Sequence, residues 1–488
     1  MKELLKKYVD EFNANDDELY KNLIPNADAY AWLSSHIPLF ECSDKEIERT
    51  YYFRWWTYRK HIKKTPEGYA ISEFLPEVPW SGKYNIINAP VGHHFFEGRW
   101  LRDCDGIFSD YLRYYLDNPE DARRYSSWLL YAAMQYELSG GELSVGYDEL
   151  LKMTEYYTAW ERERGLPSGL FWSWDDRDAM EYSISGNRNG TSIKGLRPTL
   201  NSYMYADAVA IAYFAGKLNE QSIKEEYLEK AEKIKKLINE KLLFNGFFKA
   251  KHGNSDAELL SLEERDDDTG SPMELIGYIP YMFGIPDEGL EIAFEHLADS
   301  NVFLAKTGMS TVDMRHPDFL KEHDHECLWN GYVWPFATSQ VLTGLIRTVH
   351  SGHPELKSLL VRHTELYARM HKIELDGKKL PWIDEVMSPN EYNWTSRAIL
   401  EEQGWQPDLG GRERGKDYNH STFCDLIITG IVGVKTDSKE LTLDPAIPDS
   451  WDYFKLENLE YRGKIYTVVY DKTGKKYGVG SGIKVFNS

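Results

Sequence analysis

The chain has 488 residues, of which 78 are Asp or Glu and 57 are Lys or Arg, so its formal net charge is −21. This excess of acid argues against binding to nucleic acid or anionic membranes, because both require a cationic face. The sequence contains neither a run of about 18 apolar residues nor, at its start, the apolar stretch of a signal peptide. We therefore expect no membrane segment and a cytoplasmic protein.

Helical periodicity extends over most of the chain and is interrupted by loops rich in Gly and Pro. Range 201–216 is almost free of charge, which is typical of an inner helix, whereas 221–242 has one highly charged face, which is typical of an outer helix. The pattern predicts helices over 45–63, 100–117, 119–138, 147–163, 201–216, 221–242, 273–283, 287–298, 331–350, 354–373, 392–403 and 420–434.

After about residue 435 the pattern changes to short stretches that alternate apolar and polar residues, which predict antiparallel strands. We therefore expect an N-terminal extension (1–44), one large α-domain (45–434) and a small β element packed on it (435–488).

Aromatic residues make up 14% of the chain. Sugars are recognised by aromatic rings next to polar groups, since a ring face packs on aliphatic C–H patches while its neighbours bind hydroxyls. A large helical core would also use many rings, and composition does not separate the two interpretations.

Acidic residues lie beside aromatic ones in three segments, which we interpret as loops: 93–111, 169–186 and 381–394, the last followed by 410–423. A carboxyl group desolvated by indole has a raised pKa and suits a general acid, while a solvated carboxylate can act as a base. Alternatively, such residues cap helices or pair with arginines.

These segments resemble the motifs of inverting glycoside hydrolases that have an (α/α)6 barrel, namely trehalases, processing α-glucosidases and mannosylglycerate hydrolase-like proteins. FEGRWLRDCDGIF (96–108) resembles a trehalase stretch that opens an inner helix, and FWSWDD (171–176) resembles the acid-bearing ESGWD or ESGMDNS without its Glu-Ser-Gly. The further similar segments, in the same order, are RPTLNSYMY (197–205), CLWNGYVWPFA (327–337), IDEVMSPNE (383–391) and DYNHST (417–422).

The resemblance implies an all-α (α/α)6 toroid with a C-terminal antiparallel β element. It also implies a hydrolase of an α-glucoside-like di- or oligosaccharide. Because the three acidic loops precede or follow inner-type helices, we expect them to form a closed pocket at one end of the barrel, which would make the enzyme exo-acting. Asp175 would be the general acid, with Asp176 as the alternative if the register shifts by one, and Glu385 would be the general base of an inverting reaction. The expected substrate-binding residues are Glu97, Arg102, Asp103, Trp172, Trp174, Asp176, Arg177, Asn201, Trp329, Asn330, Trp334, Trp382, Glu413 and His420.

Other functions remain open at this point. A disaccharide phosphorylase would use the same barrel, although acidic loops repel phosphate. An epimerase or lyase would use His93, His94 or His420, and a non-catalytic glycan-binding protein would need no paired carboxylates. Neither the sugar nor the oligomeric state is predicted.

No cofactor or metal is expected. The four scattered cysteines are interpreted as buried free thiols, with a disulfide or zinc site as the alternative. The run Asp266-Asp267-Asp268 is interpreted as a solvated loop or subsite lip, with a Ca²⁺ site as the alternative.

Overall fold

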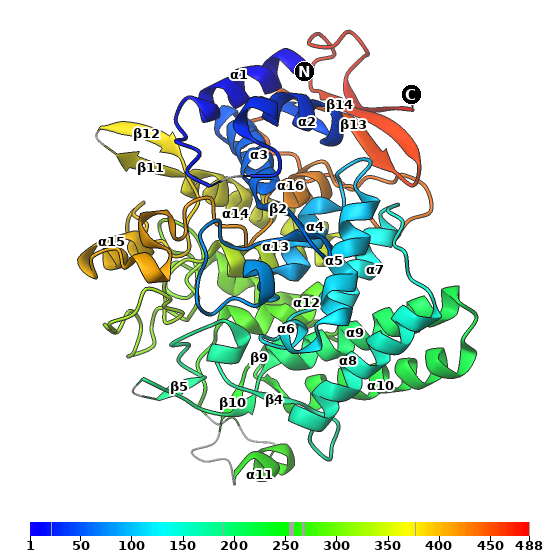
Figure 1. Cartoon of the computed structure of the whole chain (residues 1–488), viewed down its shortest axis with the longest axis vertical. Helices are drawn as coiled ribbons and strands as arrows, with labels where there is room; N and C mark the ends of the chain where they lie inside the picture. Colours follow the sequence, from blue (N-terminus) through cyan, green and yellow to red (C-terminus); the bar gives the residue numbers. More distant parts are fainter. Residues whose placement is uncertain are drawn as a thin grey trace.

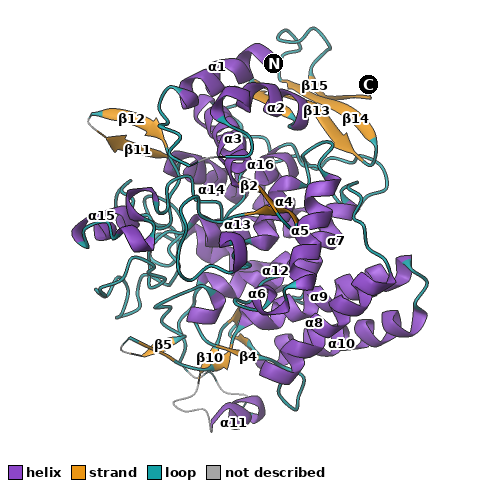
Figure 2. Ribbon diagram, in the orientation of Figure 1, coloured by secondary structure: helices purple, strands orange, loops and turns teal. Residues whose placement is uncertain are grey.

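The computed structural model describes residues 1–20, 22–188, 190–252, 258–265, 268, 270–375 and 377–487. Helices dominate its central body (Figures 1 and 2). The α-helices are α1 (Lys2–Asn13), α2 (Ala29–His36), α3 (Lys45–Tyr58), α4 (Val91–Gly98), α5 (Asp105–Asp117), α6 (Pro119–Ala122), α7 (Leu129–Leu138), α8 (Tyr147–Arg164), α9 (Pro198–Lys217), α10 (Gln221–Lys241), α11 (Leu259–Glu264), α12 (Ile279–Met282), α13 (Pro335–His350), α14 (Lys357–Met370), α15 (Thr395–Glu402) and α16 (Cys424–Leu426).

The strands are short except at the C-terminal end, where three of them form most of one antiparallel sheet in the order β1-β13-β14-β15. Their bounds are β1 (Leu39–Cys42), β2 (Ile62–Thr65), β3 (Gly68–Ile71), β4 (Trp172–Ser173), β5 (Asn187–Arg188), β6 (Thr191–Ser192), β7 (Gly195–Leu196), β8 (Leu243–Phe244), β9 (Phe247–Phe248), β10 (Lys251–His252), β11 (Lys372–Leu375), β12 (Lys378–Pro381), β13 (Tyr453–Tyr461), β14 (Lys464–Asp471) and β15 (Gly482–Asn487). The predicted C-terminal β element is confirmed.

The C-terminal sheet also contains a strand from the N-terminal segment. Strand β1 pairs with β13, with Leu39 opposite Glu457 and Cys42 opposite Phe454. The predicted N-terminal extension is therefore built into the fold: it supplies one strand of the sheet, and its helices α1 and α2 lie at the same end of the molecule (Figure 1).

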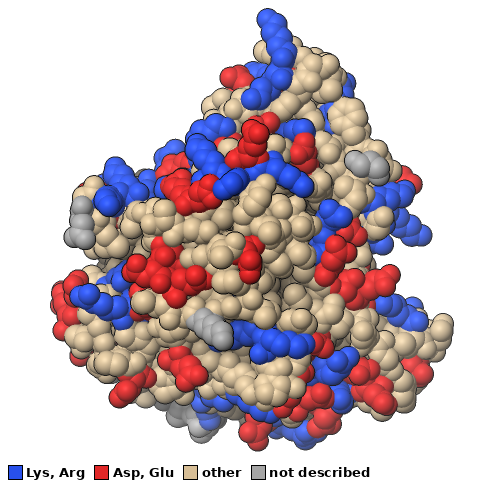
Figure 3. Space-filling view, turned by 45° about the horizontal axis from the view of Figure 1, so that its top comes forward, with Lys and Arg blue, Asp and Glu red and all other residues tan. Residues whose placement is uncertain are grey.

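Burial separates inner from outer helices as predicted. Most residues of α9 are buried, whereas α10 buries only Tyr227, Ala231, Ile234 and Ile238 and presents a charged face outward. Acidic and basic side chains are interspersed over the face shown in Figure 3. Among the described helices, none combines the length and hydrophobicity that crossing a bilayer demands.

Helix α4 differs from the prediction, which placed a loop in this segment. All eight residues of VGHHFFEG are buried. A helix buried on every side has no polar face, so the amphipathic period that reveals surface helices is absent. The predicted helix over 119–138 is divided into α6 and α7 by residues 123–128. The segment predicted as a helix over 287–298 is a 3₁₀-helix, Leu290–Ala298. The segment predicted as a helix over 420–434 contains α16 and a π-helical turn, Ile427–Ile431.

The inner helices α4, α7 and α13 run in the same direction. Near their beginnings, the ring of His93 lies against Trp128 and Phe336, at centroid distances of 4.9 and 4.7 Å. Near their other ends, Arg99 directly after α4, Gln135 of α7 and His350 of α13 line one hollow. The helical body therefore has two distinct ends, one where these helices begin and one where they finish.

Candidate active site

A cavity of about 430 Å³ lies at the end where the inner helices begin. Its wall combines aromatic rings with an unusual number of carboxyl groups, a mixture that suits a sugar. The rings belong to Trp80, Tyr125, Trp334, Phe336 and Tyr418, and the carboxyl groups belong to Glu73, Asp176, Glu181, Glu326 and Glu385.

Glu385 is buried in the wall of this cavity and has few partners. Its Oε1 accepts hydrogen bonds from the thiol of Cys327 at 3.1 Å and from the hydroxyl of Tyr418 at 3.3 Å. Its Oε2 has no hydrogen-bond partner in the described part of the chain. Burial raises the pKa of Glu385 to about 7, against the opposing effect of the nearby Arg414 cation. This carboxyl group can therefore exchange a proton near neutral pH.

Glu181 faces the same cavity from the segment that follows β4. Burial, together with the negative charges of Glu385 and Asp176, raises its pKa well above the usual range. Its neighbours Ala179 and Tyr182 both have left-handed backbone conformations, with φ of 55° and 62°. Non-glycine residues rarely adopt this conformation, and such strain concentrates at functional sites. The environment of Glu181 thus favours its protonated form, and its backbone lies on a constrained turn.

Glu73 is the third carboxyl group of the cavity with a raised pKa, which burial shifts to about 8, with a smaller contribution from Glu385. The hydroxyl of Tyr418 lies close to both carboxyl groups and lowers the pKa of Glu73 by hydrogen bonding. The cavity therefore has three acidic groups with raised pKa values that form no ion pair with any described residue.

Arg414 is the cation of the cavity and forms a buried ion pair with Glu326. Its guanidinium also lies 4.4 Å from the ring centroid of Trp80. The carboxylate of Glu326 has a lowered pKa because the attraction of Arg414 outweighs its burial. This pair is fixed in the ionised form, unlike the other glutamates.

His420 provides a neutral polar group. Both ring nitrogens are buried without a hydrogen-bond partner among the described residues. Burial lowers its pKa well below the usual range. The ring lies 3.7 Å from that of Tyr418 and 6.1 Å from that of Trp334. A neutral imidazole with free nitrogens can bind a sugar hydroxyl.

Four of the residues predicted from the sequence line this cavity: Asp176, Trp334, Glu385 and His420. Trp329 lies behind the wall, where its ring stacks on Trp334 at 4.5 Å. The structure thus brings together residues from several of the segments with similarity to the hydrolase motifs.

Asp175 lies outside the lining. It is fully buried, and its Oδ2 accepts hydrogen bonds from the backbone N–H of Tyr182 at 3.0 Å and from the amide of Asn187 at 3.3 Å. Burial raises its pKa. The carboxyl group supports the turn that contains Glu181 and does not face the cavity itself.

The predicted residues of the first segment also lie elsewhere. Glu97 accepts hydrogen bonds from the three backbone N–H groups at the start of α16, with distances of 2.8–3.2 Å. Arg102 pairs with Glu460 of the C-terminal sheet at 3.4 Å, and Asp103 is exposed. Glu97 therefore caps a helix, and Arg102 connects the helical body to the sheet.

The other predicted substrate-binding residues contact protein groups outside the cavity. The amide of Asn201, for example, binds the backbone of Phe171 and Arg197, and Glu413 pairs with Lys416. The ring of Trp172 stacks on that of Trp174. Those outside the lining are Trp172, Trp174, Arg177, Asn201, Asn330, Trp382 and Glu413.

The sequence analysis missed Glu73, Glu181, Glu326, Arg414 and Tyr418. For Glu181 a signal existed: residues 179–183, AMEYS, match the GMDNS part of ESGMDNS with Met and Ser shared and Glu in place of Asp. The alignment on FWSWDD instead gave this place to Asp175, which is six residues earlier in the chain. Tyr418 lies in DYNHST and Arg414 in the segment 410–423, but neither residue was assigned a role, and Glu73 and Glu326 lie in no motif that we recognised.

One group of side chains has the donor set of a metal site. The donor atoms of His325, Glu326 and Cys327 lie within 4.8 Å of one another. However, Arg414 already binds Glu326, and burial raises the pKa of the Cys327 thiol well above its usual range. The group therefore does not fit a resident metal. All four cysteines are buried and free, as predicted, and Asp266 and Asp267 of the possible Ca²⁺ loop lie outside the described residues.

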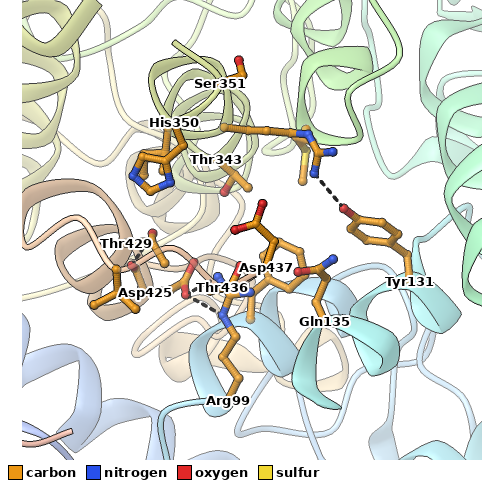
Figure 4. Close-up of a pocket in the computed structure, with 15 residues that line it drawn as sticks. Arg99, Tyr131, Gln135, Thr343, His350, Ser351, Asp425, Thr429, Thr436 and Asp437 are labelled. Carbon is orange, nitrogen blue, oxygen red and sulfur yellow. Dashed lines mark hydrogen bonds and ion pairs between the residues drawn. The ribbon is translucent and has the colours of Figure 1, made fainter. Parts of the chain in front are cut away.

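A second, smaller hollow of about 190 Å³ lies where the inner helices finish (Figure 4). It is lined by Arg99, Gln135, Arg347, His350 and Asp425, among others. Here the charges are compensated: Arg99 binds Asp425 at 2.7–2.8 Å through two nitrogens. Burial, aided by Lys435, lowers the pKa of His350 to about 4, so this imidazole is neutral.

Comparison with known structures supports the fold. A protein described as a sialidase shares 34% identity over the whole chain with a TM-score of 0.87, and the chain spans 43% of that protein's length. The GH78 family rhamnosidase of Bacillus sp. GL1 shares 12% identity over 89% of this chain and 40% of its own, with a TM-score of 0.55. An uncharacterised conserved protein from Thermus thermophilus shares 12% over 72% of this chain and 98% of its own, with a TM-score of 0.50.

Two family models match the chain directly. Residues 434–486 match the C-terminal domain of glycosyl hydrolase family 65, which corresponds to the C-terminal sheet. Residues 83–421 match the mannosylglycerate hydrolase MGH1-like glycoside hydrolase domain, and this range contains every carboxyl group of the cavity except Glu73. With its helical six-hairpin domain and its C-terminal antiparallel sheet, the chain belongs to the MGH1-like glycoside hydrolase family.

Proposed function

We propose that this glycoside hydrolase cleaves a glycosidic bond with inversion, with Glu181 as the general acid and Glu385 as the general base. The observation that carries the proposal is the pair of raised pKa values in one cavity: that of Glu181 is far above its usual range and that of Glu385 is about 7. The environment thus favours the protonated form of Glu181, while Glu385 can accept a proton near neutral pH.

In this mechanism the carboxyl group of Glu181 donates its proton to the glycosidic oxygen as the bond to the anomeric carbon breaks. The carboxylate of Glu385 takes a proton from a water molecule, which attacks the anomeric carbon from the opposite face. Inverting enzymes leave room for this water by separating the two carboxyl groups by about 6.5–9.5 Å. Afterwards Glu181 is ionised and Glu385 is protonated, and exchange with solvent restores both.

The remaining wall residues are assigned to sugar binding. His420 binds a hydroxyl through its unpartnered nitrogens, and Trp334 and Trp80 provide ring faces for C–H patches. Asp176 and Glu73 accept hydroxyl hydrogen bonds. The proposed substrate is an α-glucoside-like sugar, from whose chain end the enzyme releases one unit. A cavity of about 430 Å³ suits one or two sugar rings.

The test uses Glu181→Gln and Glu385→Gln, which preserve shape and remove acid–base capacity. On a panel of aryl glycosides and disaccharides, each substitution should lower kcat by about 10²–10⁴-fold. With aryl glycosides that have a good leaving group, Glu181→Gln should lower kcat less, because this leaving group departs without being protonated. Asp175→Asn serves as the matched control, with a much smaller loss.

NMR of the first-formed product decides the stereochemistry. An inverted anomer is expected, and retention would make Glu385 a nucleophile. If Asp175→Asn lowers kcat as much as Glu181→Gln or more, the general acid is Asp175.

A further inference from the structure

We infer that Arg197 is the positioning residue of the proposed general acid: its guanidinium binds both ends of segment 178–185 and so directs Glu181 into the cavity. The inference deepens the proposed function and rests on it, since it takes Glu181 to be the proton donor. Arg197 does not line the cavity, so it would act on the reaction only through Glu181.

At the beginning of the segment, the guanidinium binds Asp178. The side chains of this pair are 1% and 0% exposed, and Nε of Arg197 donates a hydrogen bond to Oδ2 of Asp178 at 2.6 Å. The other carboxylate oxygen, Oδ1, accepts hydrogen bonds from the hydroxyls of Ser126 and Ser173 at 2.7 and 2.8 Å. The beginning of the segment is therefore fixed to several other parts of the chain.

At the end of the segment, the other two nitrogens of the same guanidinium bind serine hydroxyls. Nη1 donates to Oγ of Ser185 at 3.1 Å, and Nη2 donates to Oγ of Ser183 at 3.2 Å. The packing here is close, because a Cβ atom added at Gly186 would lie 2.6 Å from Nη1 of Arg197 and 2.8 Å from Oγ of Ser183. The guanidinium therefore holds both ends of the segment at once.

Between these two ends the backbone is constrained. Ala179 and Tyr182 have left-handed conformations, and the carbonyl oxygen of Glu181 accepts the backbone N–H of Trp329 at 3.1 Å. Non-glycine residues keep such conformations only where the surrounding structure holds them. A guanidinium presents its N–H donors in a fixed plane and can restrain both ends together, whereas an ammonium is a compact point charge.

The expected consequence for the reaction is selective. Misplacement of a catalytic group by about 1 Å can lower a rate by about 10²-fold. If segment 178–185 relaxes, the carboxyl group of Glu181 moves away from the glycosidic oxygen, and substrates whose leaving group needs a proton are affected most. A general loss of structure would instead lower the activity on all substrates equally.

The experiment compares dinitrophenyl and phenyl α-D-glucosides, or the same two leaving groups on the sugar that the natural protein hydrolyses in the panel above. Dinitrophenolate departs without being protonated, whereas phenolate needs the proton of Glu181. Arg197→Lys keeps a positive charge beside Asp178 and loses the bonds to the serines. It should lower kcat for the phenyl glycoside by about tenfold and for the dinitrophenyl glycoside by less than about twofold.

Because replacement of a buried arginine can impair folding, a second variant is measured. Ser183→Ala/Ser185→Ala leaves the pair of Arg197 and Asp178 intact and releases the end of the segment. The single variant Ser183→Ala is included because the hydroxyl of Ser185 also binds Glu274. Both variants should show the same preference for the dinitrophenyl glycoside, with a smaller loss in the single one.

Arg99→Lys is the matched control. Arg99 forms a similarly buried pair with Asp425, with side chains that are 5% and 1% exposed, at the other end of the helical body. This substitution should lower the melting temperature, as Arg197→Lys does, but it should leave the ratio of the two kcat values unchanged.

Equal losses of kcat on the two glycosides, or no loss on either, in the folded variants would overturn the inference. Glu181→Gln in the same assay separates this failure from that of the proposed function, because it should show the largest selective loss. If Glu181→Gln shows no selectivity, the acid is wrongly assigned and the inference falls with it. If Glu181→Gln is selective and the Arg197 and serine variants are not, only the inference fails.

Discussion

The two ends of the helical body treat buried charge in opposite ways. Where the inner helices begin, Glu73, Glu181 and Glu385 line a cavity and form no ion pair with any described residue. Where the inner helices finish, Asp425 is bound by Arg99 and by the indole N–H of Trp100 at 2.7 Å. Both ends desolvate carboxyl groups, but the first leaves Glu73, Glu181 and Glu385 without a cationic partner among the described residues, whereas Asp425 at the second has one.

This difference indicates that the end with the unpaired carboxyl groups is the candidate active site. A buried carboxyl group without a partner lowers stability, because its ionised form loses the hydration that it has in the unfolded chain. Proteins retain this loss of stability at sites where the proton of the carboxyl group takes part in function. A paired carboxylate with a full set of donors contributes to structure and is unavailable for proton transfer.

The largest effect is expected at the structural end. Asp425→Asn should lower the free energy of unfolding by about 3 kcal/mol, because it leaves Arg99 buried beside a neutral group. Glu385→Gln, at the cavity, should leave stability unchanged or increase it. Thermal unfolding of both variants at pH 7.5 measures the contrast.

Adding Arg99→Met to Asp425→Asn is the control, since removal of both charges should recover part of the loss. Equal destabilisation by Asp425→Asn and Glu385→Gln would erase the contrast between the two ends.

A second prediction concerns the pH dependence of activity. Because Glu385 must be ionised and its pKa is about 7, kcat/KM should rise with pH through about 7 and fall only where Glu181 loses its proton. Arg414 lowers the pKa of Glu385, so Arg414→Gln should move the acidic limb to higher pH.

The conservative variant Arg414→Lys keeps the charge and should leave this limb in place. If the acidic limb stays at the same pH in Arg414→Gln, the group whose ionisation controls activity is not Glu385.

The smallest effect is expected for Glu73. Its pKa is about 8 in the folded chain, against an ordinary value of 4.5, so between these values the folded state binds more protons than the unfolded state. Stability is therefore lost as the pH rises from about 4.5 to about 8. Glu73→Gln should remove this loss and raise the melting temperature at pH 8 by about 2 °C.

At pH 4 Glu73 is largely protonated in both the folded and the unfolded chain, and the variant should melt with the natural protein. A stabilisation of the same size at both pH values would point to packing and not to ionisation.

Part of this molecule could be predicted from local pattern. The charge-free stretch 201–216 and the charged face of 221–242 identified α9 as an inner helix and α10 as an outer one. Glu385 was identified because IDEVMSPNE (383–391) resembles the segment that carries the general base in the inverting hydrolases. The inner or outer position of a helix can be predicted because it depends on the spacing of polar and apolar residues that are close together in the chain.

The position of the proposed general acid could not be predicted from local pattern. Asp175, Asp176 and Glu181 lie within seven residues, and each is a carboxyl group near an aromatic ring. Only the turn formed by the left-handed Ala179 and Tyr182 directs Glu181 to the cavity and leaves Asp175 behind it.

The sequence by itself determined the helical body, the C-terminal β element, the acidic charge and the class of chemistry. Tertiary structure alone decided which carboxyl groups share a cavity, that β1 joins β13 from the far end of the chain, and that Arg414 is neutralised by Glu326. The physical reason is that burial and Coulombic interaction depend on distance in space, and residues far apart in the chain supply both.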